Sequence, residues 1–174
     1  MRRSTLAAAI LLTILSSANA RDNVDREAKI KAGYLVNFAR LVVWPAAPAG
    51  TAITFCFLGG NSIHDALSVD LQKRSVGTRP VSLRYLNAQG ESVGCNVLYL
   101  DENRVLINDA PTRMHMLTVS DASAFARQGG IIQLFTESNR LRFRINVDNA
   151  KRVGLNVSSD LLQVAASVER DAIR

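Results

Sequence analysis

The side chains that most often carry out catalysis or bind metals are scarce in this sequence. It has two histidines, His64 and His115, and no HExxH, CxxC or GxSxG pattern. His64 stands beside Asp65 in an expected helix and His115 between two methionines in an expected strand, so we expect structural or surface roles for both. No close pair of carboxylates suggests general acid and base work on one substrate. The sequence therefore predicts a protein that is not an enzyme and that holds no metal or cofactor.

The two cysteines, Cys56 and Cys95, each fall in a short apolar run that is typical of a buried strand. In an oxidising compartment, to which the export signal described below directs the chain, two such cysteines pair by default. We expect a Cys56–Cys95 disulfide, which would close a loop of about 40 residues and contribute about 3–4 kcal/mol in the chain-entropy model. The alternative is two unpaired thiols that pack as small hydrophobic groups.

A stripe of arginines follows the β-hairpin predicted over residues 129–147. Two runs of alternating apolar and polar residues flank Ser138-Asn139, and asparagine tolerates the positive φ of a tight turn. In the second run the two faces differ in character, with Leu141, Phe143, Ile145 and Val147 on one and Arg140, Arg142, Arg144 and Asn146 on the other. The arginine face is either a solvated strand surface that discourages aggregation or a binding surface.

The segment after the hairpin adds further charges, and we expect it to form a short, exposed helical turn. Arginine suits bidentate pairing with carboxylates, and a regulatory interface mixes charged groups with an apolar one. We therefore hypothesise that a protein partner contacts Arg142, Arg144, Asp148, Lys151, Arg152 and Val153. Alternatively, helices on both sheet faces bury the stripe and turn its arginines into internal salt bridges.

Alternating strands and helices must position these side chains. We predict helices over residues 28–43, after Asn61 or Ser62 as cap, over 102–110, after Ser120-Asp121, after Asp148 as cap, and after Ser158-Ser159 with Leu161, Ala165 and Val168 inward. We predict strands over residues 51–58, 76–86, 95–100 and 114–119. This order indicates βαβ units. We expect a single α/β domain with a mostly parallel sheet, helices on both faces and a C-terminal antiparallel hairpin.

The pair Gly59-Gly60 separates a buried strand from a helix, an arrangement that presents backbone N–H groups to an anion. Neither GxGxxG nor GxxxxGK[ST] occurs, so an ordinary strand-to-helix turn is the preferred interpretation. A crevice at the strand ends after Gly59-Gly60 and Ser120-Asp121 could still hold a small molecule.

The first 20 residues have the features of a secretory signal peptide. A basic start precedes the apolar run of residues 6–15, and Ala18-Asn19-Ala20 is a small-x-small cleavage site, so residues 21–174 would be the mature domain. The apolar run is too short to anchor the chain in a bilayer, and no second run of about 18 residues occurs, so we expect no membrane insertion. Without Arg2 and Arg3 the chain carries 19 basic and 15 acidic residues, a charge of +4 with no long run of one sign, which argues against a nucleic-acid partner.

Several motifs together resemble the YfiR-like family of periplasmic proteins. Residues 31–45 (KAGYLVNFARLVVWP) resemble the family's opening helix, and 56–59 its first strand. Further matches in order and spacing are residues 76–80, 95–100, 117–121, 129–131, 141–148 and 154–162. The resemblance covers nearly the whole mature chain.

This resemblance implies a periplasmic regulator that binds and represses the periplasmic sensor domain of a membrane-bound diguanylate cyclase, which lowers cyclic-di-GMP signalling and affects biofilm behaviour. It also implies a homodimer. Some family members carry a second cysteine pair near the hairpin, where this chain has Gly130 and Glu137, so the resemblance does not extend to redox behaviour tied to that pair. The alternatives are a periplasmic small-molecule-binding module that acts as a ligand sensor, and an unrecognised hydrolase.

Overall fold

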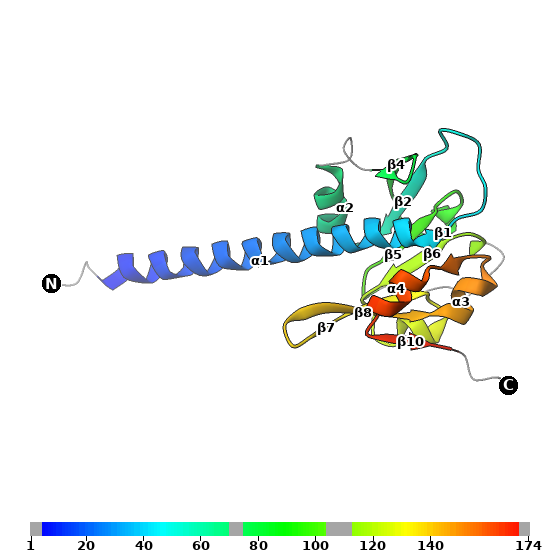
Figure 1. Ribbon diagram of the computed structural model, residues 1–174. Coiled ribbons are helices and arrows are strands. Elements are labelled where there is room, and N and C mark those ends of the chain that lie inside the picture. The colour runs from blue at the N-terminus through cyan, green and yellow to red at the C-terminus, as the bar shows by residue number, and fades with distance from the viewer. Residues whose placement is uncertain (1–4, 70–74, 104–112, 171–174) are drawn as a thin grey trace.

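The structure is a computed structural model that describes residues 5–69, 75–103 and 113–170 (Figure 1). The helices are α1 (Thr5–Leu41), α2 (Asn61–Ser68), α3 (Val147–Arg152) and α4 (Ser159–Val164), with the 3-10 turns η2 (Gln89–Ser92) and η4 (Phe125–Gln128). The strands are β1 (Val42–Val43), β2 (Ile53–Leu58), β3 (Ser75–Val76), β4 (Arg79–Tyr85), β5 (Val97–Leu100), β6 (Leu117–Ser120), β7 (Ile132–Glu137), β8 (Arg140–Asn146), β9 (Asn156–Val157) and β10 (Ser167–Glu169).

A mostly parallel sheet of eight strands has the order β10-β8-β7-β6-β5-β2-β4-β3. Its central pairs, from β7 through β6, β5 and β2 to β4, are parallel, and so is the pair β8–β10. The pairs β7–β8 and β3–β4 are antiparallel hairpins, and β1 pairs with β9 in a separate two-stranded sheet. The predicted α/β class, with a mostly parallel sheet and a C-terminal antiparallel hairpin, is confirmed.

Helix α1 lies across one face of the sheet, with α2 beside it (Figure 1). The buried side chains of α1 include Leu35, Phe38 and Ala39, which share the main hydrophobic core with Phe55 and Phe57 of β2. Side chains alternate between the two faces of a strand, so Cys56 and Leu58, the neighbours of Phe57 in β2, lie on the other face of the sheet.

The opposite face of the sheet carries a smaller core. Cys56 and Leu58 of β2 belong to it, and Phe125 of η4 packs into it, so helical segments contact both faces. The residues of this second core are Cys56, Leu58, Leu86, Cys95, Leu98, Leu100, Met116 and Phe125.

Helix α1 is longer than the sequence predicts, since it begins at Thr5 rather than near residue 28. Residues 6–15 are rich in alanine and leucine, which are strong helix formers, so the helix continues through them. Its N-terminal part extends beyond the sheet (Figure 1). Cleavage after Ala20 stays a prediction. No helix within the described residues combines the length and apolar character needed to cross a bilayer.

The hairpin of β7 and β8 has the predicted turn. Ser138 and Asn139 have φ values of 48° and 59°, and Glu137 pairs with Arg140 across them. Two central residues with positive φ match the right-handed twist of the flanking strands, which fixes the register of the pair. The apolar face of β8 therefore points to the core, as predicted.

Two helix caps differ from the prediction. Gly60, rather than Asn61 or Ser62, takes the cap position of α2, with φ 66° and ψ 40° and no side-chain cap bond. Asn146, rather than Asp148, caps α3 by accepting hydrogen bonds from the backbone N–H groups of residues 148 and 149 at 3.1 and 2.9 Å. In both places the helix therefore begins earlier than predicted, by one or two residues at α2 and by two residues at α3.

The strand predicted over residues 76–86 is two strands, because Gly77 and Thr78 form a turn between β3 and β4. The strand predicted from Met114 begins only at Leu117, because His115 has a positive φ of 59° in the preceding turn. The helix predicted over residues 102–110 lies largely outside the described part of the chain.

The last predicted helix is shorter than expected. Ser158 caps it as predicted, accepting a hydrogen bond from Leu161 N at 3.3 Å, but α4 ends at Val164. Val168 lies in strand β10, where it pairs with Ile145 and is 40% exposed, so its predicted inward place on a helix is wrong.

Candidate functional site

A crevice of about 500 Å³ opens at the carboxyl ends of strands β2, β5 and β6. This edge of a parallel sheet is where ligands usually bind, because the strand ends and the loops after them leave a hollow. Helix α1, the start of α2 and the β7–β8 hairpin complete its walls, and the lining residues are Val24, Glu27, Ala28, Lys31, Gly60, Ser62, Ile63, Tyr99, Asp101, Glu102, Asp121, Leu134, Phe135, Thr136 and Leu141. The crevice includes Gly60 and Asp121 of the two segments from which the sequence predicts it.

A network of four polar side chains joins α1 to the sheet inside this crevice. Lys31 Nζ donates to Asp121 Oδ2 at 2.5 Å and to Glu27 Oε1 at 2.7 Å. The Tyr99 hydroxyl donates to the other carboxylate oxygen of Asp121 at 3.0 Å. Both oxygens of Asp121 are therefore bound, and the pair Lys31–Asp121 holds together two motifs that lie 90 residues apart.

Both proton donors of this network hold their protons more tightly than usual. Burial, followed by the charge of Asp121, raises the pKa of the Tyr99 hydroxyl. For Lys31, burial favours the neutral amine, but the hydrogen bonds and charges of Asp121 and Glu27 outweigh it, and the pKa of Lys31 is raised. At neutral pH the two proton donors of the network are therefore an ammonium and a neutral phenol. Such groups position and bind rather than exchange protons, because an efficient acid or base has a pKa near the working pH.

Gly60 gives the crevice its shape because no larger residue fits there. Its φ of 66° is in the left-handed region, and a Cβ added to it would lie 2.5 Å from Cε1 of Tyr99. The backbone at the start of α2 therefore packs directly on the Tyr99 ring, whose hydroxyl reaches Asp121.

The charges that line the crevice are mostly negative. Among the described lining residues, four carboxylates (Glu27, Asp101, Glu102 and Asp121) face one ammonium, that of Lys31, which gives these residues a formal charge of −3. Because a surplus of like charge repels an anionic ligand, this crevice disfavours nucleotides and other phosphates.

The predicted partner surface is only partly exposed at β8. Arg142 is exposed, but Arg144 is half-buried, with its Nη1 3.4 Å from Glu169 Oε1 and its guanidinium 4.5 Å from the centre of the Phe135 ring. Glu169 reaches Arg144 because β10 pairs with β8 here, so Arg144 forms the internal salt bridge that the alternative interpretation predicts.

The α3 part of the predicted surface contains one buried residue. Lys151 and Arg152 are exposed and Asp148 is half-buried. Val153 is 2% exposed and belongs to the main core, so its expected place on an exposed turn is wrong. The apolar centre of the predicted interface is therefore missing at this position.

Two buried asparagines that the sequence analysis left without a role hold α3 in place. Besides capping the helix, Asn146 donates its side-chain amide to Ala126 O at 3.0 Å. Asn149 donates to the same carbonyl at 2.9 Å and to Gly130 O at 2.7 Å. Arg152 in turn donates to Asn149 Oδ1. Arg152 therefore has a structural contact as well as an exposed position.

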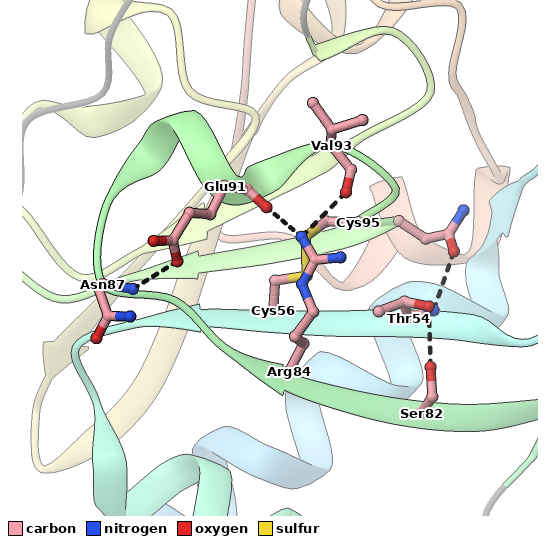
Figure 2. The surroundings of a disulfide bond; sticks show 9 residues. Thr54, Cys56, Ser82, Arg84, Asn87, Glu91, Val93 and Cys95 are labelled. Atoms are coloured by element: carbon pink, nitrogen blue, oxygen red, sulfur yellow. Dashed lines mark hydrogen bonds between the residues drawn. A yellow bond between two sulfur atoms is a disulfide. The ribbon is translucent and has the colours of Figure 1, made fainter.

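The structure contains the predicted Cys56–Cys95 disulfide, which joins β2 to the residues before β5 on the sheet face opposite α1. Arg84 lies over it in Figure 2, with Nη2 donating to the carbonyl of Val93 at 3.0 Å and lying 3.5 Å from Cys95 Sγ. Both cysteines are at most 5% exposed, so the bond is shielded from solvent.

This chain has no second cysteine pair at Gly130 and Glu137, the region near the hairpin that the resemblance brought up. The full chain has only these two cysteines, and a Cβ added to Gly130 would lie 2.2 Å from Cε1 of Phe125. Packing of η4 against the hairpin thus requires glycine at this position.

His64 lies in helix α2, as the sequence predicts, whereas His115 lies in the turn before β6 and not in the expected strand. The His64 ring lies between the rings of Phe57 and Tyr85, with centroid distances of 5.4 and 6.2 Å. His115 sits in a turn, where its backbone N–H donates to Val153 O at 2.7 Å.

The sequence analysis missed Lys31 and Tyr99 as site residues. Lys31 is the first residue of the opening-helix motif and Tyr99 lies within an apolar strand, so nothing local marks either as polar lining. One signal could have identified Lys31: it is a lysine on the side of α1 that meets the sheet, and a buried ammonium is rarely found without a carboxylate partner.

Comparison with known proteins supports the resemblance seen in the motifs. No curated protein matches the chain. The family profile described as YfiR/HmsC-like, in contrast, matches residues 28–166, from the part of α1 that packs on the sheet to the residue before β10. This range includes Lys31, Tyr99 and Asp121 together with both cysteines. With the match covering most of its length, the chain belongs to the YfiR/HmsC-like family.

Proposed function

We propose that this chain is a periplasmic regulatory protein that binds the periplasmic sensor domain of a membrane-bound diguanylate cyclase and represses the cyclase. Cyclic-di-GMP production would then rise when the protein is lost. The observation that carries the proposal is the family match over residues 28–166. The absence of catalytic motifs in the sequence agrees with a regulator that acts by binding.

The partner surface that we propose consists of the exposed charges at β8 and α3. This surface has three exposed cations, Arg142, Lys151 and Arg152. Asp148, which lies between them in the sequence, is half-buried. Arginine forks and lysines at the rim of an interface select a partner of opposite charge and speed its association. Arg144 and Val153 support this surface from below, because one is held by Glu169 and the other lies in the core.

Export and assembly belong to the same proposal. The signal peptide of residues 1–20 would place the mature domain in the periplasm, where the cyclase presents its sensor domain, and we propose that the protein works there as a homodimer. The disulfide is consistent with an oxidising compartment.

The test is a pull-down from detergent-solubilised membranes of the producing bacterium, with the tagged protein as bait. We expect a membrane protein with a cyclase domain among the captured proteins, and a higher cyclic-di-GMP level in a strain that lacks this gene. Capture of no cyclase, together with an unchanged cyclic-di-GMP level, would refute the proposal.

Charge reversals in the bait test the proposed surface. Arg142→Glu and Lys151→Glu should each weaken capture of the cyclase while circular dichroism stays unchanged. Lys29→Glu is the matched control, because Lys29 is an exposed cation on α1 and lies outside the surface. Equal capture by all three variants would remove this surface from the proposal.

The crevice supports a second candidate function, a ligand sensor. Its volume of about 500 Å³ lies in the range of small-molecule sites, and it lies at the sheet edge where such sites form. Native mass spectrometry of the protein purified from the periplasm tests this candidate: a small molecule retained with the chain supports it, and a mass equal to that of the chain alone argues against it.

A further inference from the structure

The crevice at the ends of β2, β5 and β6 has walls of two different kinds. Asp101 and Glu102 follow β5 on one side, whereas Leu134, Phe135 and Leu141 of the hairpin line another part of it. Asp101 accepts a hydrogen bond from the backbone N–H of Asn103 at 3.4 Å, a long and weak contact, and Glu102 is exposed. Carboxylates therefore stand beside apolar surface in one hollow.

Within the described part of the lining, the ammonium of Lys31 does not neutralise these two carboxylates. Lys31 Nζ is bound to Asp121 at 2.5 Å and Glu27 at 2.7 Å, so its charge is already matched. No other cation lines the crevice among the residues that the structure describes, so a ligand that enters it meets the negative charge of Asp101 and Glu102. A cation gains from that field, and an anion would have to overcome it.

We propose that this crevice is a binding site for a small organic amine, with its ammonium at Asp101 and Glu102 and its apolar body against Leu134, Phe135 and Leu141. The inference deepens the ligand-sensor function and rests on it, but not on cyclase repression. Apolar lining with a few convergent polar groups is the usual composition of small-molecule sites. The same charge pattern disfavours the anionic cyclic dinucleotide itself as the occupant.

Isothermal titration calorimetry with two matched probes tests the charge requirement. 2-Phenylethylamine and phenylacetate share an aromatic body and carry opposite charges at neutral pH. We expect saturable binding of the amine that weakens as salt is added, and no binding of phenylacetate. Absence of saturable amine binding up to millimolar concentration, or equal binding of both probes, would overturn the proposal.

Variants locate the binding site. The double change Asp101→Asn and Glu102→Gln keeps side-chain size and removes both charges, and should weaken amine binding about tenfold or more. Ser62→Trp should block the crevice, since Ser62 is an exposed lining residue whose enlargement costs little in folding. Asp160→Asn is the control, an exposed carboxylate on α4 that should leave binding unchanged.

The outcomes separate this inference from cyclase repression, because the titration contains no cyclase. Unchanged amine binding in both crevice variants, with wild-type circular dichroism, would place the amine elsewhere and refute the assignment. Failure of the membrane pull-down, in contrast, would count against cyclase repression and would not change the result of the amine titration.

Discussion

Gly60 offers a sharp test of how the crevice is built, because two separate effects oppose any side chain there. The backbone has φ 66°, and a Cβ would lie 2.5 Å from Cε1 of Tyr99. The left-handed conformation costs a non-glycine residue about 1–2 kcal/mol. Forcing one carbon into a packed ring contact costs about 1–3 kcal/mol more. We therefore expect Gly60→Ala to lower the free energy of unfolding by about 2–5 kcal/mol.

Gly77 is the matched control, since it separates these two effects. It has a φ of 60°, close to that of Gly60, but no atom outside its chain neighbours lies within 4 Å of a Cβ built on it. Gly77→Ala should therefore cost only the backbone term, about 1–2 kcal/mol. The difference between the two variants measures the contact with Tyr99.

Urea unfolding followed by circular dichroism measures both variants. For a domain of this size each kcal/mol lowers the melting temperature by about 2–4 °C, so thermal melts give a second reading. The Gly60 variant should also lose amine binding in the crevice, because the Tyr99 ring must move. Equal destabilisation by the two substitutions would refute the close packing of α2 on Tyr99.

Three further predictions follow from the rest of the molecule. Replacing both cysteines, Cys56→Ala with Cys95→Ala, should lower the free energy of unfolding by about 4 kcal/mol, which is the chain-entropy value for a loop of this length. A loss below about 1 kcal/mol in urea titration would contradict the entropic account. The free energy of unfolding should fall above about pH 10, because folding raises the pKa values of Lys31 and Tyr99 from 10.5 and 10.0, and the folded chain therefore keeps protons that the unfolded chain releases. Lys31→Met should flatten this fall in unfolding curves taken between about pH 9 and 11. Arg144→Glu should cost about 1–2 kcal/mol, through its ion pair and ring contact, whereas Arg142→Glu should stay within about 0.5 kcal/mol; equal melting temperatures of the two variants would contradict this difference.

Local patterns account for the parts of the fold that the sequence predicts well. Alternation along residues 140–146 gives β8 its faces, and Ser138-Asn139 gives its turn, because both depend only on neighbours in the chain. The buried strands β2 and β5 follow from short apolar runs bounded by turn residues. The pairing of Cys56 with Cys95 follows from the number of cysteines and from the export signal that the sequence predicts.

The errors occur where distant contacts outweigh local preference. Val168 continues an apolar helical period, but the open edge of β8 takes residues 167–169 as a parallel strand. Asn61 and Ser62 are good caps, yet the close approach to Tyr99 puts the left-handed Gly60 at that position. No periodicity in a single sequence contains the neighbouring strand that decides such cases.

The same limit applies to the candidate site. Gly59-Gly60 and Ser120-Asp121 predict where the crevice opens, because glycine-rich turns and strand ends are visible in the sequence. Lys31 joins the site only because α1 packs across the sheet, which brings residues 90 positions apart within 2.5 Å. The fold must be known before this pair can be recognised.

Helix α1 links the crevice to the hairpin through two side chains one turn apart. Lys31 binds Asp121 after β6, and the Tyr34 hydroxyl donates to Leu141 O on β8 at 3.2 Å. The Tyr34 ring also packs on Phe143, with a centroid distance of 5.8 Å. A helix held at consecutive turns by two strands cannot shift at one contact without straining the other. We therefore expect a change at the crevice that moves Lys31 to disturb the contact of Tyr34 with β8, the strand that carries Arg142.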